Sequence, residues 1–206
     1  MKRFLEHIRK EERKLSLRSR ITNTILITVL GITLGNISKW LDSRTFDKPI
    51  LDYLDLGNFF SDMAIWLFIA LSIAIFSESP HRAGVNVFLF FLGMTVSYHA
   101  YTVVLNGFNP GRYMMIWYGF TLISPVLAYF SWYAKSNSKY SIIIDSIIIH
   151  IMLVSCFGIG MWYFDIKGML YTVTFIASLL VIYKDIKIIT VSFVIGLILS
   201  ILLKMV

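Results

Sequence analysis

Seven long apolar stretches, separated by short polar segments, follow one another from residue 21 to the end of the chain. A membrane-crossing helix needs about 20 mostly apolar residues, because the hydrocarbon core is about 30 Å thick and each residue rises about 1.5 Å. The pattern therefore predicts an all-α bundle of about seven transmembrane helices. The expected spans are Ile21–Lys39, Asn58–Ser77, Arg82–Leu105, Tyr113–Ala134, Ser141–Tyr163, Gly168–Tyr183 and Ile188–Lys204.

The last two spans are short, and length argues that they are separate. Residues 168–205 would measure about 57 Å as one helix, which is too long for a single crossing. The polar cluster Lys184–Lys187 is expected to form the hairpin between them. Six spans plus a re-entrant or interfacial segment is the alternative.

Polar residues mark off a basic tail, residues 1–20, from a transmembrane domain, residues 21–206. Apolar residues of the tail fall near one face of a helix, which favours an amphipathic helix on the membrane surface, with a solvated tail as the alternative. Anionic lipid headgroups are its expected partner. The one long connection, residues 40–57, carries Leu51, Leu54 and Leu56 and is expected to pack on the outer face as a short helix or lid.

Basic residues in the connections predict the orientation. With the N-terminus in the cytoplasm, the inner segments carry thirteen Lys and Arg residues and the outer segments carry six. Cytoplasmic loops are enriched in Lys and Arg, so we expect a cytoplasmic N-terminus. No small-x-small cleavage site follows the first apolar stretch, which favours an uncleaved first helix over a signal peptide.

The composition supports lipid as the solvent: the chain is 57% hydrophobic and 15% charged, against about 25% charged residues in soluble domains. The net charge of +7 is concentrated in the tail, with no nucleic-acid-reading pattern beside it, so we expect no nucleic acid partner. The single cysteine, Cys156, excludes an intrachain disulfide and is expected to be a small buried hydrophobe.

Motifs that would fix a chemistry are missing from the sequence. It contains no HExxH, GxSxG or GxxxxGK[ST] pattern, and no two of its four histidines are closely spaced. We therefore expect no enzyme activity, no metal and no cofactor. An intramembrane enzyme working from Asp62 and His99 would lack an identifiable nucleophile.

Polar and aromatic residues from the first four spans are expected to meet at one outer level. Ionisable groups inside a bilayer are costly, so each needs a reason. The hypothesis is an outward-facing binding pocket, and its alternative is an interfacial aromatic belt in which Asp62 pairs with Lys39 or Arg112. The candidate substrate-binding residues are Asn36, Lys39, Asp62, Trp66, Tyr98, His99, Arg112, Tyr113 and Trp117.

Two further polar residues are expected to be structural. Asp145, near the inner end of the fifth span, is expected to pair with a cation such as Lys139 or Arg82. His150, near the midplane, is expected to make a helix-to-helix hydrogen bond.

Small residues and one proline predict how the helices pack. Gly31 and Gly35 have the spacing that lets two membrane helices approach closely. Pro125, preceded by Ser124 in the middle of the fourth span, should kink that helix and free a carbonyl.

Two segments stand out: SESPHRAGVNVFLFFLGM at residues 77–94, followed by Ser97-Tyr98, and LISPVLAY at residues 122–129, followed by Trp132-Tyr-Ala-Lys. With these segments the chain resembles a small bacterial family of polytopic membrane proteins of unknown function. The resemblance covers about residues 57–165 and implies a bacterial plasma-membrane protein, with no activity to carry over.

A looser likeness is to the substrate-binding membrane subunits of energy-coupling-factor vitamin transporters. The chain is similar to them in size, basic N-terminus and small-residue first helix, and it departs from them in its seventh span and in having Gly-x-x-x-Gly for Ala-x-x-x-Ala. The likeness implies binding or transport of a small solute. The alternative is a non-catalytic accessory or immunity-type membrane protein that acts through a protein partner or as a homo-oligomer.

Overall fold

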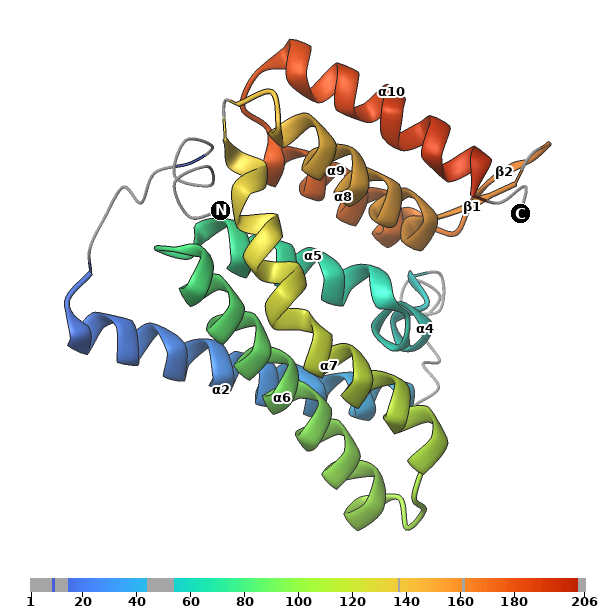
Figure 1. Ribbon diagram of the computed structural model, residues 1–206. Helices are drawn as coiled ribbons and strands as arrows, with labels where there is room; N and C mark the ends of the chain where they lie inside the picture. Colours follow the sequence, from blue (N-terminus) through green and yellow to red (C-terminus); the bar gives the residue numbers. More distant parts are fainter. Residues whose placement is uncertain (1–8, 10–14, 44–53, 137, 161, 204–206) are drawn as a thin grey trace.

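Figure 1 shows the computed structural model of the chain, which describes residues 9, 15–43, 54–136, 138–160 and 162–203. These residues form eight α-helices, one 3-10 turn and one short hairpin. The elements are α2 (Leu17–Asp42), α4 (Leu56–Ser61), α5 (Met63–Phe76), α6 (Pro80–Leu105), α7 (Gly111–Ser131), η1 (Trp132–Lys135), α8 (Ser141–Cys156), β1 (Phe157–Ile159), β2 (Phe164–Ile166), α9 (Met169–Ile182) and α10 (Ile186–Leu202).

Three of the described helices are long and apolar enough to cross a membrane: α2, α6, and α7 together with η1. Four shorter apolar helices, α5, α8, α9 and α10, accompany them. This is the composition of a multi-pass membrane protein, and one of these seven apolar helices falls at each predicted span. The predicted break between the last two helices is present, because α9 ends at Ile182 and α10 begins at Ile186. Ile186 and Lys187 of the predicted connection belong to α10.

Capping side chains set where the helices begin. Ser16 Oγ accepts from the backbone N–H of Ser19, which starts α2 one turn before the predicted Ile21. Ser79 caps α6 in the same way and is followed by Pro80 at the first helical position. Asp185 accepts from two backbone N–H groups of α10. Residues 1–8 and 10–14 of the predicted amphipathic tail, and Leu51 of the predicted lid, lie outside the described residues. α4 contains the last two residues of the predicted connection and the first four of the predicted second span, which is interrupted at Asp62 before α5 begins.

The prediction that the fifth span continues to Tyr163 is wrong. α8 ends at Cys156, and Phe157 of β1 pairs with Ile166 of β2 in an antiparallel hairpin. Glycines at 158 and 160 each cost a helix about 1 kcal/mol, and the aromatic residues around them favour strands. Cys156 itself is fully buried, as expected.

Helices α2 and α6 pack backbone against backbone. A Cβ on Gly31 would lie 2.2 Å from the carbonyl oxygen of Phe90, and one on Gly35 would lie 2.4 Å from that of Met94. Gly93 of α6 faces α2 in the same way, with its Cβ position 2.9 Å from the carbonyl oxygen of Thr28. The predicted close approach through small residues is confirmed.

The buried side chains form two hydrophobic clusters that meet at α5. One joins α5 to α6 and α7 and contains Trp66, Phe90 and Met114. The other joins α5 to α8, α9 and α10 and contains Ile149 and Phe175. Figure 1 shows α2 and α6 on one side of α5, α8, α9 and α10 on the other, and α7 running across α5.

Polar residues gather at the two ends of this bundle. We call the end that carries Arg20, Glu78, Arg82, Lys135 and Lys184 the basic end; α2 and α6 begin there, and α5, α7 and α9 end there. The opposite end, which carries Lys39, Asp42, Asp62, Tyr98, Tyr113 and Lys167, is called the far end.

Candidate functional site

Four of the predicted binding residues, Trp66, Tyr98, Tyr113 and Trp117, surround one small cavity at the far end. Its volume is about 10 Å³. A cavity needs about 10–15 Å³ to hold one water molecule, so the aromatic side chains have filled the space between them. The predicted convergence occurs, and it leaves no room for a solute in this conformation.

Lys39 joins the edge of this aromatic cluster. It is buried, with Nζ 2.5 Å from Oδ2 of Asp42 and 5.3 Å from the ring centroid of Tyr98. The hydroxyl of Tyr98 donates to the same Asp42 carboxylate at 3.4 Å. The charge of the Lys39 ammonium is therefore balanced by the Asp42 carboxylate and by the face of the Tyr98 ring, which are structural contacts.

Asp62 pairs with neither of the predicted cations, Lys39 and Arg112. Its Oδ2 lies 3.2 Å from Nζ of Lys167, which also donates to the carbonyl of Ser155 at 2.9 Å. No local pattern in the sequence indicates this partner, because Lys167 is more than a hundred residues away, in the loop after β2. The pair fixes the start of α5 to the loop before α9.

The remaining three predicted residues do not join the cluster. His99 bonds to the hydroxyl of Tyr118 at 2.9 Å and to Oδ1 of Asn109 at 3.0 Å. Asn36 donates to a carbonyl of its own helix, and Arg112 is exposed. Asp62 and His99 thus have separate partners, and among the described residues no group of three His, Cys, Asp or Glu side chains could hold a metal ion.

Basic side chains cap the helices that end at the basic end. Arg9 Nη1 donates to the carbonyl oxygens of Ile75 at 3.2 Å and Trp132 at 2.6 Å, which close α5 and α7. Lys135 Nζ donates to the last turn of α9, at the carbonyl of Val181. The final carbonyls of a helix lack intrahelical donors and carry partial negative charge, so cations there satisfy both needs.

A buried ion pair joins α8 to the α9–α10 hairpin. Lys184 Nζ lies 2.7 Å from Oδ2 of Asp145, and both side chains are almost fully buried. Lys184 also donates to the carbonyl of Ala134 and to Ser141 Oγ. Burial lowers the pKa of the Lys184 ammonium, and the neighbouring carboxylate opposes that shift. The prediction that Asp145 pairs with Lys139 or Arg82 is wrong.

A hydrogen bond between side chains also joins α8 to α10. His150 Nδ1 lies 2.9 Å from Ser200 Oγ, which joins α8 to α10 and confirms the predicted helix-to-helix hydrogen bond.

In α7, Pro125 has no N–H for the carbonyl of Thr121, and the hydroxyl of Ser124 donates to that oxygen at 2.8 Å. The freed carbonyl predicted from the sequence is therefore satisfied within its own helix.

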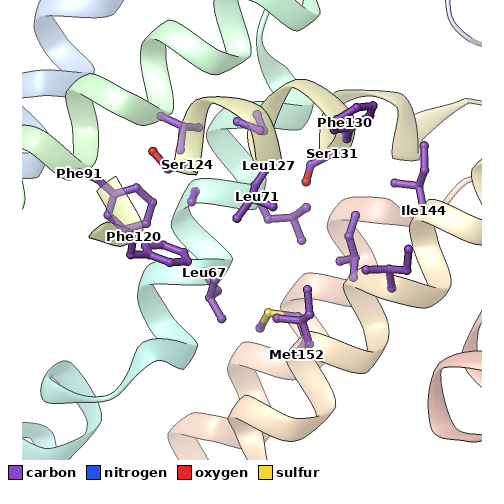
Figure 2. A pocket seen from close by; sticks show the side chains of 17 residues that line it. Leu67, Leu71, Phe91, Phe120, Ser124, Leu127, Phe130, Ser131, Ile144 and Met152 are labelled. Carbon is purple, nitrogen blue, oxygen red and sulfur yellow. The ribbon is translucent and has the colours of Figure 1, made fainter. Parts of the chain in front are cut away.

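A crevice of about 340 Å³ lies beside α5, between α7 and α8. Figure 2 shows side chains of α5, α7 and α8 facing this space, with Phe91 of α6 at one end. Its lining residues are Leu67, Ala70, Leu71, Ala74, Val87, Phe91, Phe120, Ser124, Leu127, Ala128, Phe130, Ser131, Ile144, Ile147, Ile148, Ile151 and Met152.

Exposure along the lining shows where the crevice opens. Ala74 and Phe91 on the floor are 1% exposed, whereas Leu127 on α7 and Ile147 on α8 are 44% and 48% exposed. The mouth therefore lies between α7 and α8, part-way along both helices. If these helices span the bilayer, the mouth faces acyl chains and not water.

The walls of the crevice favour an apolar guest. Ser124 and Ser131 supply the only hydroxyls among the described lining residues, none of which is titratable, and the Ser124 hydroxyl already donates to Thr121. Small-molecule sites are concave, mostly apolar and about 300–1,000 Å³ in volume. The crevice meets that description of a binding site.

The crevice has no counterpart among the sites predicted from the sequence. Small residues contribute to its lining: Ala70 and Ala74 on α5 and Ala128 on α7. Small residues in a membrane helix signal close packing as often as a void, so no pattern in the sequence separates the two.

No protein-family model, curated protein or solved structure matches the chain.

Proposed function

We propose that this multi-pass membrane protein takes the apolar chain of an amphiphilic molecule from the bilayer into the crevice, with the basic end in the cytoplasm of a bacterial cell. The role is one of binding, without chemistry. The observation that carries the proposal is the crevice itself, which is apolar, of ligand size and open between α7 and α8.

The basic end supports the proposed orientation. Arg9, Lys135 and Lys184 hold the ends of α5, α7 and α9 there, so the cations that bias the topology are also part of the packed structure. Lys and Arg in short connections favour the cytoplasmic side.

Binding of a polar solute at the far end is the second candidate. Its support is that Lys39, Trp66, Tyr98, Tyr113 and Trp117 come together there. It requires the far end to open, because a cavity of about 10 Å³ holds no solute. A metabolite that stabilises the wild type, and no longer stabilises a Tyr98→Ala variant, would favour this function over the crevice.

Photolabelling tests the crevice. The full-length protein is reconstituted into bilayers that contain phosphatidylcholine with a diazirine on one acyl chain, and labelled residues are mapped by mass spectrometry. We expect label on the floor at Leu71 and Ala74, besides the label that every lipid-facing surface acquires. In the variant Ala70→Phe, the added ring occupies the crevice, so the label on the floor should disappear.

Ala100→Phe is the matched control. Ala100 is exposed on α6 and does not line the crevice, so this variant should keep the wild-type labelling of the floor. Absence of floor label in the wild type, or floor label that survives in Ala70→Phe, would overturn the proposal.

A further inference from the structure

A second cavity, of about 160 Å³, lies at the basic end where α2 and α6 begin and α5 ends. Its polar side is formed by Arg20, Glu78 and Arg82, and its apolar side by Ile27 and Phe76. Phe76 is 70% exposed, so the apolar side continues onto the outer surface of the bundle. A cavity with charged groups at one edge and exposed apolar residues at the other has the shape of an interfacial lipid site.

The only carboxylate of this cavity among the described residues is committed to one arginine. Glu78 accepts from Arg20 through both oxygens, at 2.9 Å from Nε and 2.5 Å from Nη2, and from the backbone N–H of Leu15 at 3.0 Å. The hydrogen bond from Arg20 lowers the pKa of Glu78 below its usual value, so the carboxylate is ionised at neutral pH.

The second arginine binds neutral oxygens. Arg82 Nη2 donates to the carbonyl of Arg20 at 2.8 Å and to Oγ1 of Thr24. Thr24 in turn donates to Oδ1 of Asn86 at 2.8 Å, so Arg82 is held in place by a network that carries no charge of its own. Among the described residues no carboxylate accepts a hydrogen bond from Arg82, and the positive ends of α2 and α6 add to its charge.

We propose that this cavity binds the phosphate of an anionic phospholipid headgroup, with Arg82 as the principal cation and an acyl chain lying over Ile27 and Phe76. Arginine recognises phosphate through paired N–H donors, and the hydrogen-bond acceptors of Arg82 among the described residues are neutral oxygens. The inference rests on the proposed membrane placement and not on the crevice.

Asn23 offers a test that spares the packed network. It lines the cavity from α2 and is exposed, and an acidic residue near a helix N-terminus does not destabilise the helix. Asn23→Asp places a negative charge against the phosphate. Thr22→Asp adds the same charge one residue earlier, at an exposed position outside the cavity, and is the matched control.

The measurement is thermal stability of the full-length protein in nanodiscs of phosphatidylcholine alone or mixed with phosphatidylglycerol, together with lipid retention by native mass spectrometry. We expect phosphatidylglycerol to stabilise the wild type and Thr22→Asp and to lose this effect in Asn23→Asp. Arg82→Gln should weaken retention of phosphatidylglycerol by about fivefold, since one basic residue near the surface contributes about 1 kcal/mol.

Two outcomes would overturn the inference. Equal loss of the phosphatidylglycerol effect in Asn23→Asp and Thr22→Asp would mean that only the general surface charge matters. Stabilisation by inorganic phosphate in phosphatidylcholine nanodiscs, equal to that by phosphatidylglycerol, would assign the cavity to a free anion. Because the readout involves none of the crevice residues, failure here leaves the crevice proposal intact, and failure of the photolabelling leaves this one intact.

Discussion

The α2–α6 interface and the α7–α8 interface use small residues in opposite ways. Along α2 and α6, Gly31, Gly35 and Gly93 let the backbones touch, and nothing is left between them. Along α7 and α8, Ala128 and Ser124 face a space that α8 does not enter. The difference teaches that a small residue specifies the distance between helices only when the partner helix is brought close by something else.

Polar contacts supply that constraint at one end of the α7–α8 interface. Lys184 ties the α9–α10 hairpin to Ala134, just after α7, and to Ser141, at the start of α8. The two helices are therefore held at the basic end, and the crevice lies beyond this attachment, between their middles. The α2–α6 interface is therefore held along its length by packing, whereas the α7–α8 interface is held at the basic end.

The largest effect is expected from removing that anchor. Lys184→Met leaves the carboxylate of Asp145 buried without a cation, which costs about 3–5 kcal/mol of unfolding free energy. Replacing both members, as in Asp145→Leu with Lys184→Met, should recover most of this loss. Denaturation of the purified protein in mild detergent measures both variants.

Lys187→Met is the control for this prediction, because Lys187 is exposed in the same hairpin and should change stability little. Equal stability of Lys184→Met and Lys187→Met would show that the α7–α8 interface does not depend on the buried ion pair.

An intermediate effect is expected at the glycine interface. Gly31→Ala places a methyl group where the carbonyl oxygen of Phe90 lies, so the helices must separate, at a cost of about 1–3 kcal/mol. Gly119 of α7 has no atom within 4 Å of its Cβ position, so Gly119→Ala should instead stabilise the protein by about 0.5–1 kcal/mol. Changes of the same sign in the two variants would contradict close packing of α2 on α6.

The smallest change in stability is expected when the pH is lowered. Glu78 joins the beginning of α2 to α6 through Arg20, and its pKa is lowered from the usual 4.5. A carboxylate with a lowered folded-state pKa contributes stability above its unfolded pKa, and this contribution is lost as the pH falls below about 4.5. Thermal unfolding at pH 7 and at acidic pH should therefore show a smaller loss for Glu78→Gln than for the wild type. Equal losses of thermal stability in the wild type and in Glu78→Gln would show that Glu78 does not stabilise the attachment of α2 to α6.

Much of the fold follows from local sequence. The apolar stretches predicted the seven apolar helices, the cluster at Lys184 predicted the last hairpin, and the spacing of Gly31 and Gly35 predicted a close helix pair. Each of these depends on residues near one another in the chain. The helix predicted across residues 157–163 failed because hydropathy alone does not separate an apolar strand from an apolar helix.

The candidate sites were less predictable because they depend on distant partners and on space. The pairs Asp62–Lys167 and Asp145–Lys184 join residues far apart in the chain, and several cations were equally plausible from the sequence. The far-end aromatic residues came together as expected but packed against one another. The crevice is a space between helices, and it depends on how α7 and α8 are placed beside α5.

Methyl NMR of the native methionines tests the crevice most directly. Met152, which lines the crevice, and Met114, which lies in the packed cluster of α5, α6 and α7, are 2% and 1% exposed, so both are shielded from water. In nanodiscs of protonated lipid, with the protein deuterated except at the methionine methyl groups, we predict a nuclear Overhauser effect between Met152 and the acyl-chain methylenes and none for Met114. No acyl-chain contact at Met152 would contradict a crevice that admits lipid chains.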